Sequence, residues 1–370
     1  MIIGVLGAGQ LGRMLALAGY PLGLRLRFFD PTPDAAAGEI APLMTGSYED
    51  HAALRAFADG LDAVTYEFEN VPVEAARILG QWVRVLPGPQ ALEVAQDRLA
   101  EKDFFKSVGV EPAPYRAADS PADVRAAVAG LGLPCILKTR RGGYDGKGQV
   151  VLREGFSAAD AWQEIGGVPA VVEGFVPFRR ELSLLSVRSS GGEVRCWPLV
   201  ENEHREGILR LSRCPAREST DALQPQADAH ARGVLEGLDY VGVLALEFFE
   251  LDGRLLVNEM APRVHNSGHW TIEGAQCSQF ENHLRAVAGL PLGSTELRGY
   301  SAMLNLVGDT PPTAQLASCE GLHIHLYGKE PRPGRKLGHV GICTTTPEER
   351  EAIIRRSERL VGKTGEIISG

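Results

Sequence analysis

Hydrophobic and polar positions alternate in a strand-and-helix pattern over the first 96 residues. Short apolar runs are each followed by a stretch whose apolar side chains recur at helical spacing. The expected strands are residues 2–6, 26–29 and 63–66, and the expected helices begin at Gln10, around Asp50 and at Pro72. Strands that alternate with helices form parallel sheets, so this segment is predicted to be a small doubly wound α/β domain.

The pattern changes after residue 96. Residues 97–108 have the spacing of one helix, and Pro112 and Pro114 follow its end. From about Pro134 the apolar runs are joined by turn dipeptides typical of antiparallel strands, namely Gly142-Gly143, Gly191-Gly192 and Asp252-Gly253. Further helices are expected over residues 221–238 and 280–288.

These changes predict three parts. We expect an N-terminal domain over residues 1–96, a connecting helix with a small lobe over residues 97–178, and a larger α+β lobe over residues 179–370.

The amino-acid composition limits which binding partners and which cellular location we expect for this protein. The 38 basic and 47 acidic residues give a net charge of −9 without long runs of one sign, which argues against nucleic acid or an anionic membrane as partner. The six cysteines form no close pair, which favours reduced thiols over a zinc site. The chain opens on a strand without a basic leader, and no apolar run is long enough to span a bilayer, so we expect a cytoplasmic protein.

The most informative segment is a hairpin over residues 242–260. Two apolar strands meet at Asp252-Gly253, and Glu247 and Glu259 lie near their far ends with Asn258 beside them. Acidic side chains in such strands are costly to bury without a cation, so these oxygens predict a magnesium site, the bland alternative being surface carboxylates. Magnesium with so few protein ligands usually also binds phosphates, which points to ATP.

The register of this hairpin tests that prediction. A strict two-residue turn would place Glu247 opposite Asn258, with Glu259 on the other face. A three-residue loop, or a bulge, would place Glu247 opposite Glu259 on one face. The magnesium hypothesis therefore requires one of these two irregularities.

A glycine turn follows the first strand. The run Gly7-Ala-Gly-Gln-Leu-Gly12, with Asp30 ending the second strand, matches the dinucleotide-binding pattern, yet such a turn suits any phosphorylated ligand. NAD is therefore only an alternative. Glu69 and Asn70 follow the third strand, where ligands bind in such sheets; alternatively they begin a helix, with Asn70 as its cap.

Two further segments suit phosphates. Residues 135–149 join two apolar strands through four glycines, and Lys138, Arg140, Arg141 and Lys147 add charge that a structural glycine hairpin would not need. The segment lacks the pattern of a Walker loop. Cations also gather in a predicted loop at Lys329, Arg332, Arg335, Lys336 and His339, where the alternative is a solvated turn.

These motifs together resemble the N5-carboxyaminoimidazole ribonucleotide synthase family of ATP-grasp enzymes. The resemblance rests on RGGYDGKGQ (141–149), the carboxylate hairpin, NEMAPRVHNSGHWT (258–271) and KEPRPGRKLGH (329–339), and it spans residues 4–341. HNSGHWT is its specific part. It implies a Rossmann-like pre-ATP-grasp domain followed by an ATP-grasp fold, and a homodimer.

The resemblance also implies residue roles. Around ATP it places Arg98, Lys138, Gly143, Tyr144, Asp145, Gly146, Lys147, Gly148, Gln149, Glu173, Gly174, Phe175, Val176, Glu181, His204, Asn258 and Glu259, with the backbone of residues 173–176 at the adenine and Glu181 at the ribose. Glu247 and Glu259 become magnesium ligands. The ribonucleotide would contact Gly9, Gln10, Leu11, Glu69, Asn70, His269, Lys329, Arg332, Arg335 and Lys336.

The implied reaction is the ATP-dependent carboxylation of 5-aminoimidazole ribonucleotide by bicarbonate, through carboxyphosphate. Its candidate catalytic residues are Asp145, Lys147, Arg263, His265 and Asn266. For His265 and His269 the alternative is a structural hydrogen bond, and Trp270 is expected to pack. Rival functions are another ATP-grasp ligase, such as formate-dependent glycinamide ribonucleotide transformylase, an NAD-binding oxidoreductase, or a nucleotide-binding protein without turnover.

Overall fold

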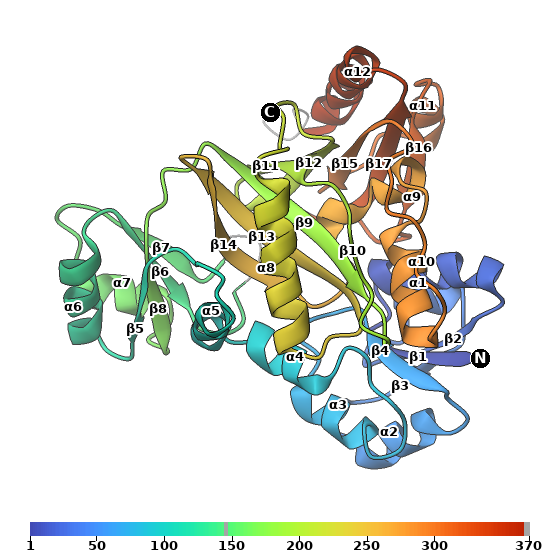
Figure 1. The fold of residues 1–370 in the computed structure, drawn as a ribbon, viewed down its shortest axis with the longest axis horizontal. Helices are drawn as coiled ribbons and strands as arrows, with labels where there is room; N and C mark the ends of the chain where they lie inside the picture. Colours follow the sequence, from blue (N-terminus) through green and yellow to red (C-terminus); the bar gives the residue numbers. More distant parts are fainter. Residues whose placement is uncertain (144–146, 366–370) are drawn as a thin grey trace.

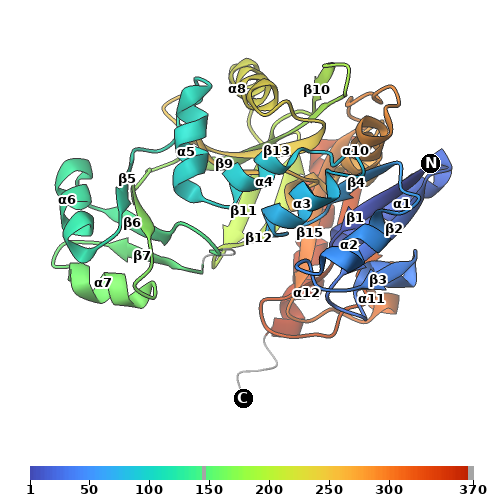
Figure 2. The same ribbon diagram turned by 90° about the horizontal axis from the view of Figure 1, so that it is seen from below.

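The computed structural model describes residues 1–143 and 147–365, and side chains up to residue 361. Its strands form three sheets, one at the N-terminus, one in a small lobe that projects to the left in Figure 1, and a long one between them that continues towards the C-terminus. Figure 2 shows the small lobe and the N-terminal sheet at opposite ends of the molecule.

The N-terminal sheet is parallel throughout, as predicted, in the order β3-β2-β1-β4. Its core includes Phe29, Phe57 and Tyr66, which are fully buried. The elements are β1 (Ile2–Leu6), α1 (Gln10–Gly19), η1 (Tyr20–Leu22), β2 (Arg25–Asp30), η2 (Ala36–Glu39), β3 (Leu43–Thr45), α2 (His51–Ala58), β4 (Ala63–Tyr66), α3 (Val73–Leu79) and α4 (Pro89–Ala95).

Helix α3 corrects one alternative. Its N-cap is Pro72, and no side chain caps the helix, so the interpretation of Asn70 as a cap is wrong. The side chain of Glu69 is paired with Arg263 instead.

The predicted connecting helix is α5 (Arg98–Ser107). Asp97 caps it, because its carboxylate accepts hydrogen bonds from the amides of Leu99 and Ala100. The same carboxylate receives two hydrogen bonds from Arg140, at 3.0 and 2.8 Å. One carboxylate therefore fixes both the start of α5 and the beginning of the glycine-rich loop.

The small lobe holds an antiparallel sheet of order β5-β8-β6-β7. Two helices share a core with this sheet that includes Leu137 and Trp162. The elements are β5 (Tyr115–Ala118), α6 (Pro121–Leu131), β6 (Cys135–Thr139), β7 (Gln149–Leu152), α7 (Ala158–Glu164) and β8 (Ala170–Gly174).

The long sheet has the order β14-β13-β9-β11-β12-β15-β17-β16, with β10 paired to β9. Helix α8 packs on one face, over Leu184 and Leu244, and α10 packs on the other, between this sheet and α1. The strands are β9 (Arg180–Arg188), β10 (Val194–Cys196), β11 (Val200–Arg205), β12 (Ile208–Cys214), β13 (Gly242–Leu251), β14 (Arg254–Ala261), β15 (Tyr300–Val307), β16 (His323–Leu326) and β17 (Lys336–Thr344). The helices are α8 (Gln224–Gly237), η3 (Asn266–Gly268), α9 (Thr271–Gly274), α10 (Gln279–Ala288), α11 (Thr313–Ala317) and α12 (Pro347–Gly365).

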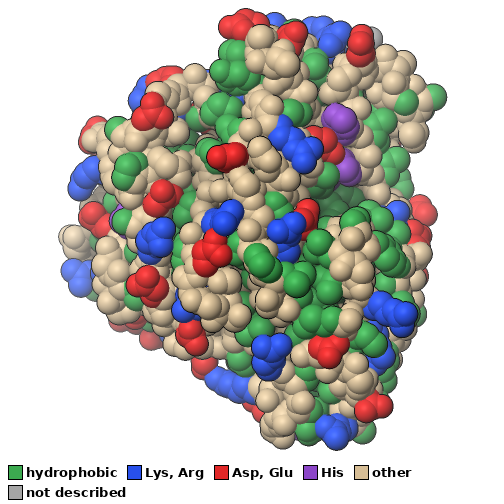
Figure 3. Space-filling view, turned by 45° about the vertical axis from the view of Figure 1, so that its right-hand side comes forward, with side chains coloured by type: hydrophobic (Ala, Val, Ile, Leu, Met, Phe, Trp, Pro, Cys, Tyr) green, Lys and Arg blue, Asp and Glu red, His purple; other side chains and the backbone are tan. Residues whose placement is uncertain are grey.

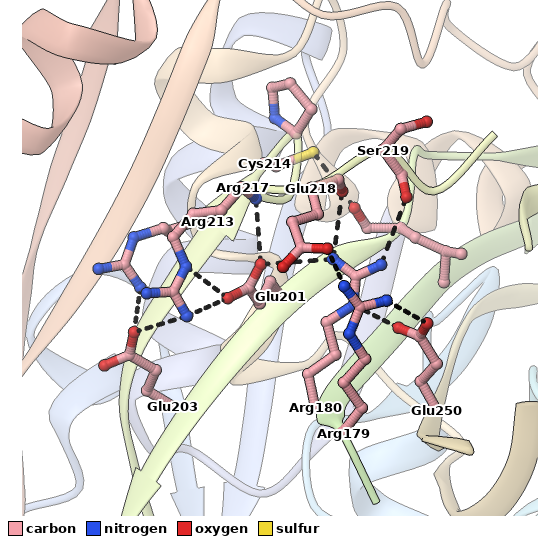
Figure 4. Close-up of polar contacts among 12 residues, drawn as sticks. Arg179, Arg180, Glu201, Glu203, Arg213, Cys214, Arg217, Glu218, Ser219 and Glu250 are labelled. Atoms are coloured by element: carbon pink, nitrogen blue, oxygen red, sulfur yellow. Dashed lines mark hydrogen bonds and ion pairs between the residues drawn. The ribbon is translucent and has the colours of Figure 1, made fainter. Parts of the chain in front are cut away.

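An ion-pair network fixes the start of β9 (Figure 4). Arg180 bonds to the buried carboxylate of Glu250 on β13 and lies 3.6 Å from Glu201 on β11. Arg217, in the loop after β12, also bonds to Glu201. Because successive side chains of a strand point to opposite faces, this network directs the next residue, Glu181, to the other face of the sheet.

The exterior carries charges of both signs. Figure 3 shows one face, on which basic and acidic side chains are interspersed. All six cysteines are free thiols. Among the residues that the structure describes, no helix is long and apolar enough to cross a membrane.

Candidate active site

Glu247 and Glu259 lie directly opposite each other on β13 and β14. The turn has two residues, since Leu251 pairs with Arg254, but a bulge after Glu247 shifts the register. Phe248 pairs with Val257, so Asn258 is the extra residue of the bulge. The bulge that the magnesium hypothesis allowed is therefore present.

The two carboxylates repel each other. Burial and the charge of Glu259 raise the pKa of Glu247 to about 7. Burial also disfavours the charged form of Glu259, but Arg98, whose Nη1 is 2.9 Å from Oε2, outweighs it and lowers the pKa of Glu259. A pair of hard oxygen ligands in which one carboxyl resists ionisation fits a bound divalent cation.

Few side chains are available to bind a metal ion at the Glu247–Glu259 pair. In residues 1–143 and 147–365 no group of three or more His, Cys, Asp or Glu side chains has the arrangement of a metal site. A cation at the glutamate pair would therefore have two carboxylates as its side-chain ligands, and other groups would have to fill its remaining positions.

A buried triad lies beside the pair. Glu173 on β8 accepts Lys138 from β6 at 2.8 Å and Lys102 from α5 at 3.1 Å. Burial opposes its ionisation, yet the two ammonium groups lower the pKa of Glu173 to about 2. One carboxylate between two lysines leaves an excess positive charge, which suits an anionic ligand.

Sequence reasoning missed Lys102. It lies one helical turn after Arg98, so both side chains face β14, and it donates to the backbone oxygen of Asn258 at 3.4 Å. Only this spacing within α5 hinted at a shared face. Glu101 was missed as well, although its carboxylate accepts the amide of Met260 at 2.8 Å.

The glycine-rich segment lies against the same groups. Arg98 donates to the backbone oxygen of Gly143 at 3.1 Å, and Lys138 pairs with Gln149 across β6 and β7. A backbone hydrogen bond closes the base of the loop, since the amide of Thr139 donates to the carbonyl oxygen of Gly148 at 2.9 Å. Three predicted residues, Tyr144, Asp145 and Gly146, lie outside the described part of the chain.

The segment predicted to read adenine, residues 173–176, begins at the end of β8 and continues beyond it. Gly174 and Phe175 donate their amides to the oxygens of Pro114 and Pro134, and the side chain of Phe175 is exposed whereas Val176 is buried. On the neighbouring sheet, Glu181 Oε2 is 2.8 Å from Nδ1 of His204. Hydrogen bonding to Glu181 raises the pKa of His204 despite its burial.

The segment after β14 lies beside the Glu247–Glu259 pair, away from the lysines on Glu173. Nε2 of His265 is 3.4 Å from Oε1 of Glu247. Arg263 is ion-paired with Glu69, and its charge is also felt by Glu67 and Glu247. Asn266 exchanges two hydrogen bonds with Asn305, at 3.0 and 2.6 Å.

Two residues of this segment are internal. His269 is 1% exposed, and its Nδ1 is 3.3 Å from Nε2 of Gln279, as in the structural alternative. Burial lowers the pKa of His269 well below its usual range. Trp270 is fully buried, as predicted.

The N-terminal glycine turn is occupied by a side chain of the protein. Glu67 accepts the amides of Gly9 at 2.6 Å and Gly12 at 2.9 Å, where a dinucleotide phosphate would bind. Leu11 is buried, and Gln10 accepts a hydrogen bond from Lys329. The turn therefore does not offer the free amides that the NAD alternative needs.

The cationic segment is only partly a loop. Lys329, Arg332 and Arg335 precede β17, but Lys336 begins that strand. His339 was placed among the cations, which is wrong: it is fully buried in β17, stacked on His325 with ring centroids 4.4 Å apart, and burial lowers its pKa well below the usual range.

Three family models match the chain. Residues 1–96 match the ribonucleotide synthetase pre-ATP-grasp domain, residues 103–280 match the ATP-grasp domain, and residues 301–353 match the phosphoribosylaminoimidazole carboxylase C-terminal domain. The fold and its paired carboxylates thus define an ATP-grasp ligase.

Individual relatives agree over almost the whole length. An N5-carboxyaminoimidazole ribonucleotide synthase of Pseudomonas aeruginosa is 52% identical and covers 98% of this chain and 99% of its own. The crystal structure of the synthetase from Thermus thermophilus has a TM-score of 0.93 and 56% identity, covering 97% and 98%. A synthase from Aspergillus clavatus in complex with ADP and 5-aminoimidazole ribonucleotide has a TM-score of 0.91 and 32% identity, covering 98% of both chains. This chain belongs to the N5-carboxyaminoimidazole ribonucleotide synthase family.

Proposed function

We propose that this chain uses ATP and bicarbonate to convert 5-aminoimidazole ribonucleotide into N5-carboxyaminoimidazole ribonucleotide in purine biosynthesis, with release of ADP and phosphate. The carrying observation is the position of the Glu247–Glu259 pair, with the Lys138–Glu173 group on one side and His265 on the other. Family membership and the ligands of the Aspergillus relative support the same reaction.

The nucleotide would bind next to α5 and the small lobe. Lys138 and Arg98 would face the ATP phosphates, and Glu181 with His204 would contact the ribose, since they lie on the face of the sheet that carries Glu247. The loop from Gly143 to Gln149 would cover the phosphates and exclude water, with Asp145 and Lys147 near the reacting groups.

Magnesium is the cation that this site suits. Glu247 and Glu259 would hold it, with Asn258 beside the phosphates, and ATP would complete its ligands. Bound there, the ion offsets charge on the transferred phosphoryl group. The raised pKa of Glu247 supports the proposal, because a divalent cation removes the repulsion that causes it.

Bicarbonate belongs beside His265. An oxygen of bicarbonate attacks the γ-phosphorus, ADP leaves, and the resulting carboxyphosphate separates into carbon dioxide and phosphate. The amine of the ribonucleotide then attacks carbon dioxide, forming the carbamate with loss of a proton. Arg263, His265 and Asn266 would hold the acid and its charged oxygens in place.

The ribonucleotide belongs at the N-terminal sheet. Because the amide of Gly9 is bonded to Glu67, we assign the 5′-phosphate to the cations Lys329, Arg332, Arg335 and Lys336. The residues Gly9, Gln10, Leu11, Glu69 and Asn70 would border the remainder of the ribonucleotide, whereas the buried His269 keeps its structural bond to Gln279. The bond from Lys329 to Gln10 joins these two groups.

Phosphate release tests the function. We expect ATP hydrolysis to rise strongly when the ribonucleotide is added with bicarbonate, together with an acid-labile carbamate. Bicarbonate depletion should stop carbamate formation, and formate should not restore it. Turnover with formate would instead assign the chain to the transformylases, and no hydrolysis under any condition would make it a binding protein.

The proposal includes a homodimer, as the family resemblance suggests, and a cytoplasmic location, as the sequence predicts. Light scattering on the purified protein measures the first point, and a monomer over the working concentration range would contradict it.

A further inference from the structure

A line of buried hydrogen bonds leads from the centre of the long sheet to His265. Oγ of Ser212 donates to Oδ1 of Asn202 at 2.7 Å, and Nδ2 of Asn202 donates to Oγ of Ser183 at 3.0 Å. Ser183 in turn donates to Oγ of Ser267 at 2.9 Å. All four side chains belong to buried residues, from β12, β11, β9 and η3.

Asn202 gives this line a direction. Its carboxamide nitrogen can only donate, so the oxygen of Ser183 accepts there and its single proton goes to Ser267. The hydroxyl proton of Ser267 is then left for Nδ1 of His265, which lies 2.9 Å away.

A second donor reaches the same nitrogen. The backbone amide of Ser267 donates to Nδ1 of His265 at 3.3 Å, which requires this nitrogen to carry no proton. The proton of a neutral ring must then be on Nε2, which faces Oε1 of Glu247 at 3.4 Å.

We propose that Ser212, Asn202, Ser183 and Ser267 are positioning residues that fix the tautomer of His265, so that its Nε2–H donates towards the acid bound beside Glu247. None of the four needs to touch a substrate. They act through the histidine, as outer hydrogen bonds do around metal-ligating histidines.

The assignment makes His265 a donor and not a base. A fixed Nε2–H offers a hydrogen bond to a charged oxygen of bicarbonate or carboxyphosphate, whereas a ring with its proton on Nδ1 would turn a lone pair towards that oxygen. This role rests on the proposed function, but the tautomer itself is a property of the protein without ligands.

Nuclear magnetic resonance of protein with ¹⁵N-labelled histidine tests the tautomer. Protonated and unprotonated ring nitrogens differ in ¹⁵N shift, and the spectrum of His265→Gln identifies the signals of His265. We expect an unprotonated Nδ1 and a protonated Nε2 in the unaltered protein. A proton on Nδ1 would overturn the proposal, whatever reaction the enzyme catalyses.

Asn202→Asp is the decisive variant. A carboxylate accepts from Ser183 and Ser212 alike, so the proton of Ser183 turns away from Ser267 and the line reverses. We expect part of the His265 signal to shift to the Nδ1-protonated form and kcat to fall about 10-fold, with ADP affinity unchanged. An unchanged tautomer would show that the backbone amide of Ser267 is enough to fix it, and would overturn the positioning role of the four side chains.

Ser183→Ala provides the same test if Asn202→Asp does not fold, because it removes the donor to Ser267. Its matched control is Ser186→Ala, since Ser186 is equally buried on β9 but donates to the backbone oxygen of Leu244, at 3.3 Å, which is not part of the line. We expect Ser183→Ala to lower kcat and alter the tautomer signal, and the control to change neither. If Ser183→Ala and Ser186→Ala changed kcat and the tautomer signal equally, the hydrogen-bonded line would have only a structural role, and the proposal would be rejected.

Discussion

The carboxylate of Glu67 accepts the amide of Gly9 at 2.6 Å, and so takes the position that a phosphate occupies in a dinucleotide-binding turn. The domain keeps the glycine pattern of such a turn but fills it with its own anion. Burial raises the pKa of Glu67, although the amides of Gly12 and Gly9 oppose the shift. The turn is therefore a structural contact between β1, α1 and β4.

Glu67→Gln tests this role. A glutamine can accept one of the two amides, but its own NH2 group faces the other, so one buried donor loses its acceptor. We expect the free energy of unfolding to fall by about 1–3 kcal/mol in urea titrations. NAD should bind neither the unaltered protein nor the variant, and measurable NAD affinity in the unaltered protein would contradict the closed turn.

Glu259→Gln should abolish carboxylation while the fold persists. The substitution removes one of the two opposed carboxylates and frees Arg98 from its ion pair. Circular dichroism and ATP-dependent phosphate release measure the two effects. The exposed Glu236 on α8 gives a control, since Glu236→Gln should keep full turnover. Normal rates for Glu259→Gln at ordinary magnesium would remove the metal assignment.

Lys138 and Lys102, which both pair with Glu173, should differ in function, the first acting on ATP and the second on stability. Lys138→Ala should weaken ATP binding and slow phosphoryl transfer by about 100-fold, because a fixed cation near developing charge stabilises it by several kcal/mol. Lys102 is 1% exposed and pairs with the buried Glu173, so Lys102→Met should mainly lower the free energy of unfolding. We expect a loss of about 3 kcal/mol, at the low end for a broken buried ion pair, because Glu173 keeps Lys138 as a partner. ATP titration and urea unfolding of both variants decide this. If Lys138→Ala left the kinetics unchanged, Lys138 would be structural.

The parts of the molecule with strong local patterns were predictable. The parallel N-terminal sheet follows from the alternation of apolar runs with helical spacing, and the hairpin from Asp252-Gly253. The sequence offered two irregularities that would align Glu247 with Glu259, and only the structure shows that a bulge at Asn258 does so. The local sequence pattern predicts where the strands are, whereas tertiary packing determines their register.

Contacts between distant segments were not predictable. Lys102 and Glu173 are 71 positions apart and meet only because α5 lies between β14 and the small lobe, and Glu67 reaches Gly9 across the parallel sheet. His339 follows four cations in sequence, but strand β17 carries it into the core. Helix α12 also escaped prediction, as the last thirty residues carried no assigned pattern.

His283 joins the N-terminal sheet to the long sheet. From α10 its Nε2 is 2.8 Å from Oγ1 of Thr65 on β4, and its Nδ1 accepts the amide of Val243 on β13 at 3.1 Å. The ring is fully buried, and burial lowers the pKa of His283 to about 4. Protonation would therefore place a charge between the two sheets and remove the acceptor for Val243.

This contact should make stability sensitive to acid. The unfolded chain binds a proton at His283 near pH 6.5 and the folded chain near pH 4, so the contribution is complete above pH 6.5 and is lost as the pH falls towards 4. The slope for one proton is about 1.4 kcal/mol per pH unit. In urea unfolding between pH 6.5 and 4.5, His283→Gln should lower stability at neutral pH and flatten the acid slope by up to that amount. The exposed His51 gives the control His51→Gln, which should retain the slope of the unaltered protein. Equal slopes in all three proteins would show that His283 does not carry this acid sensitivity.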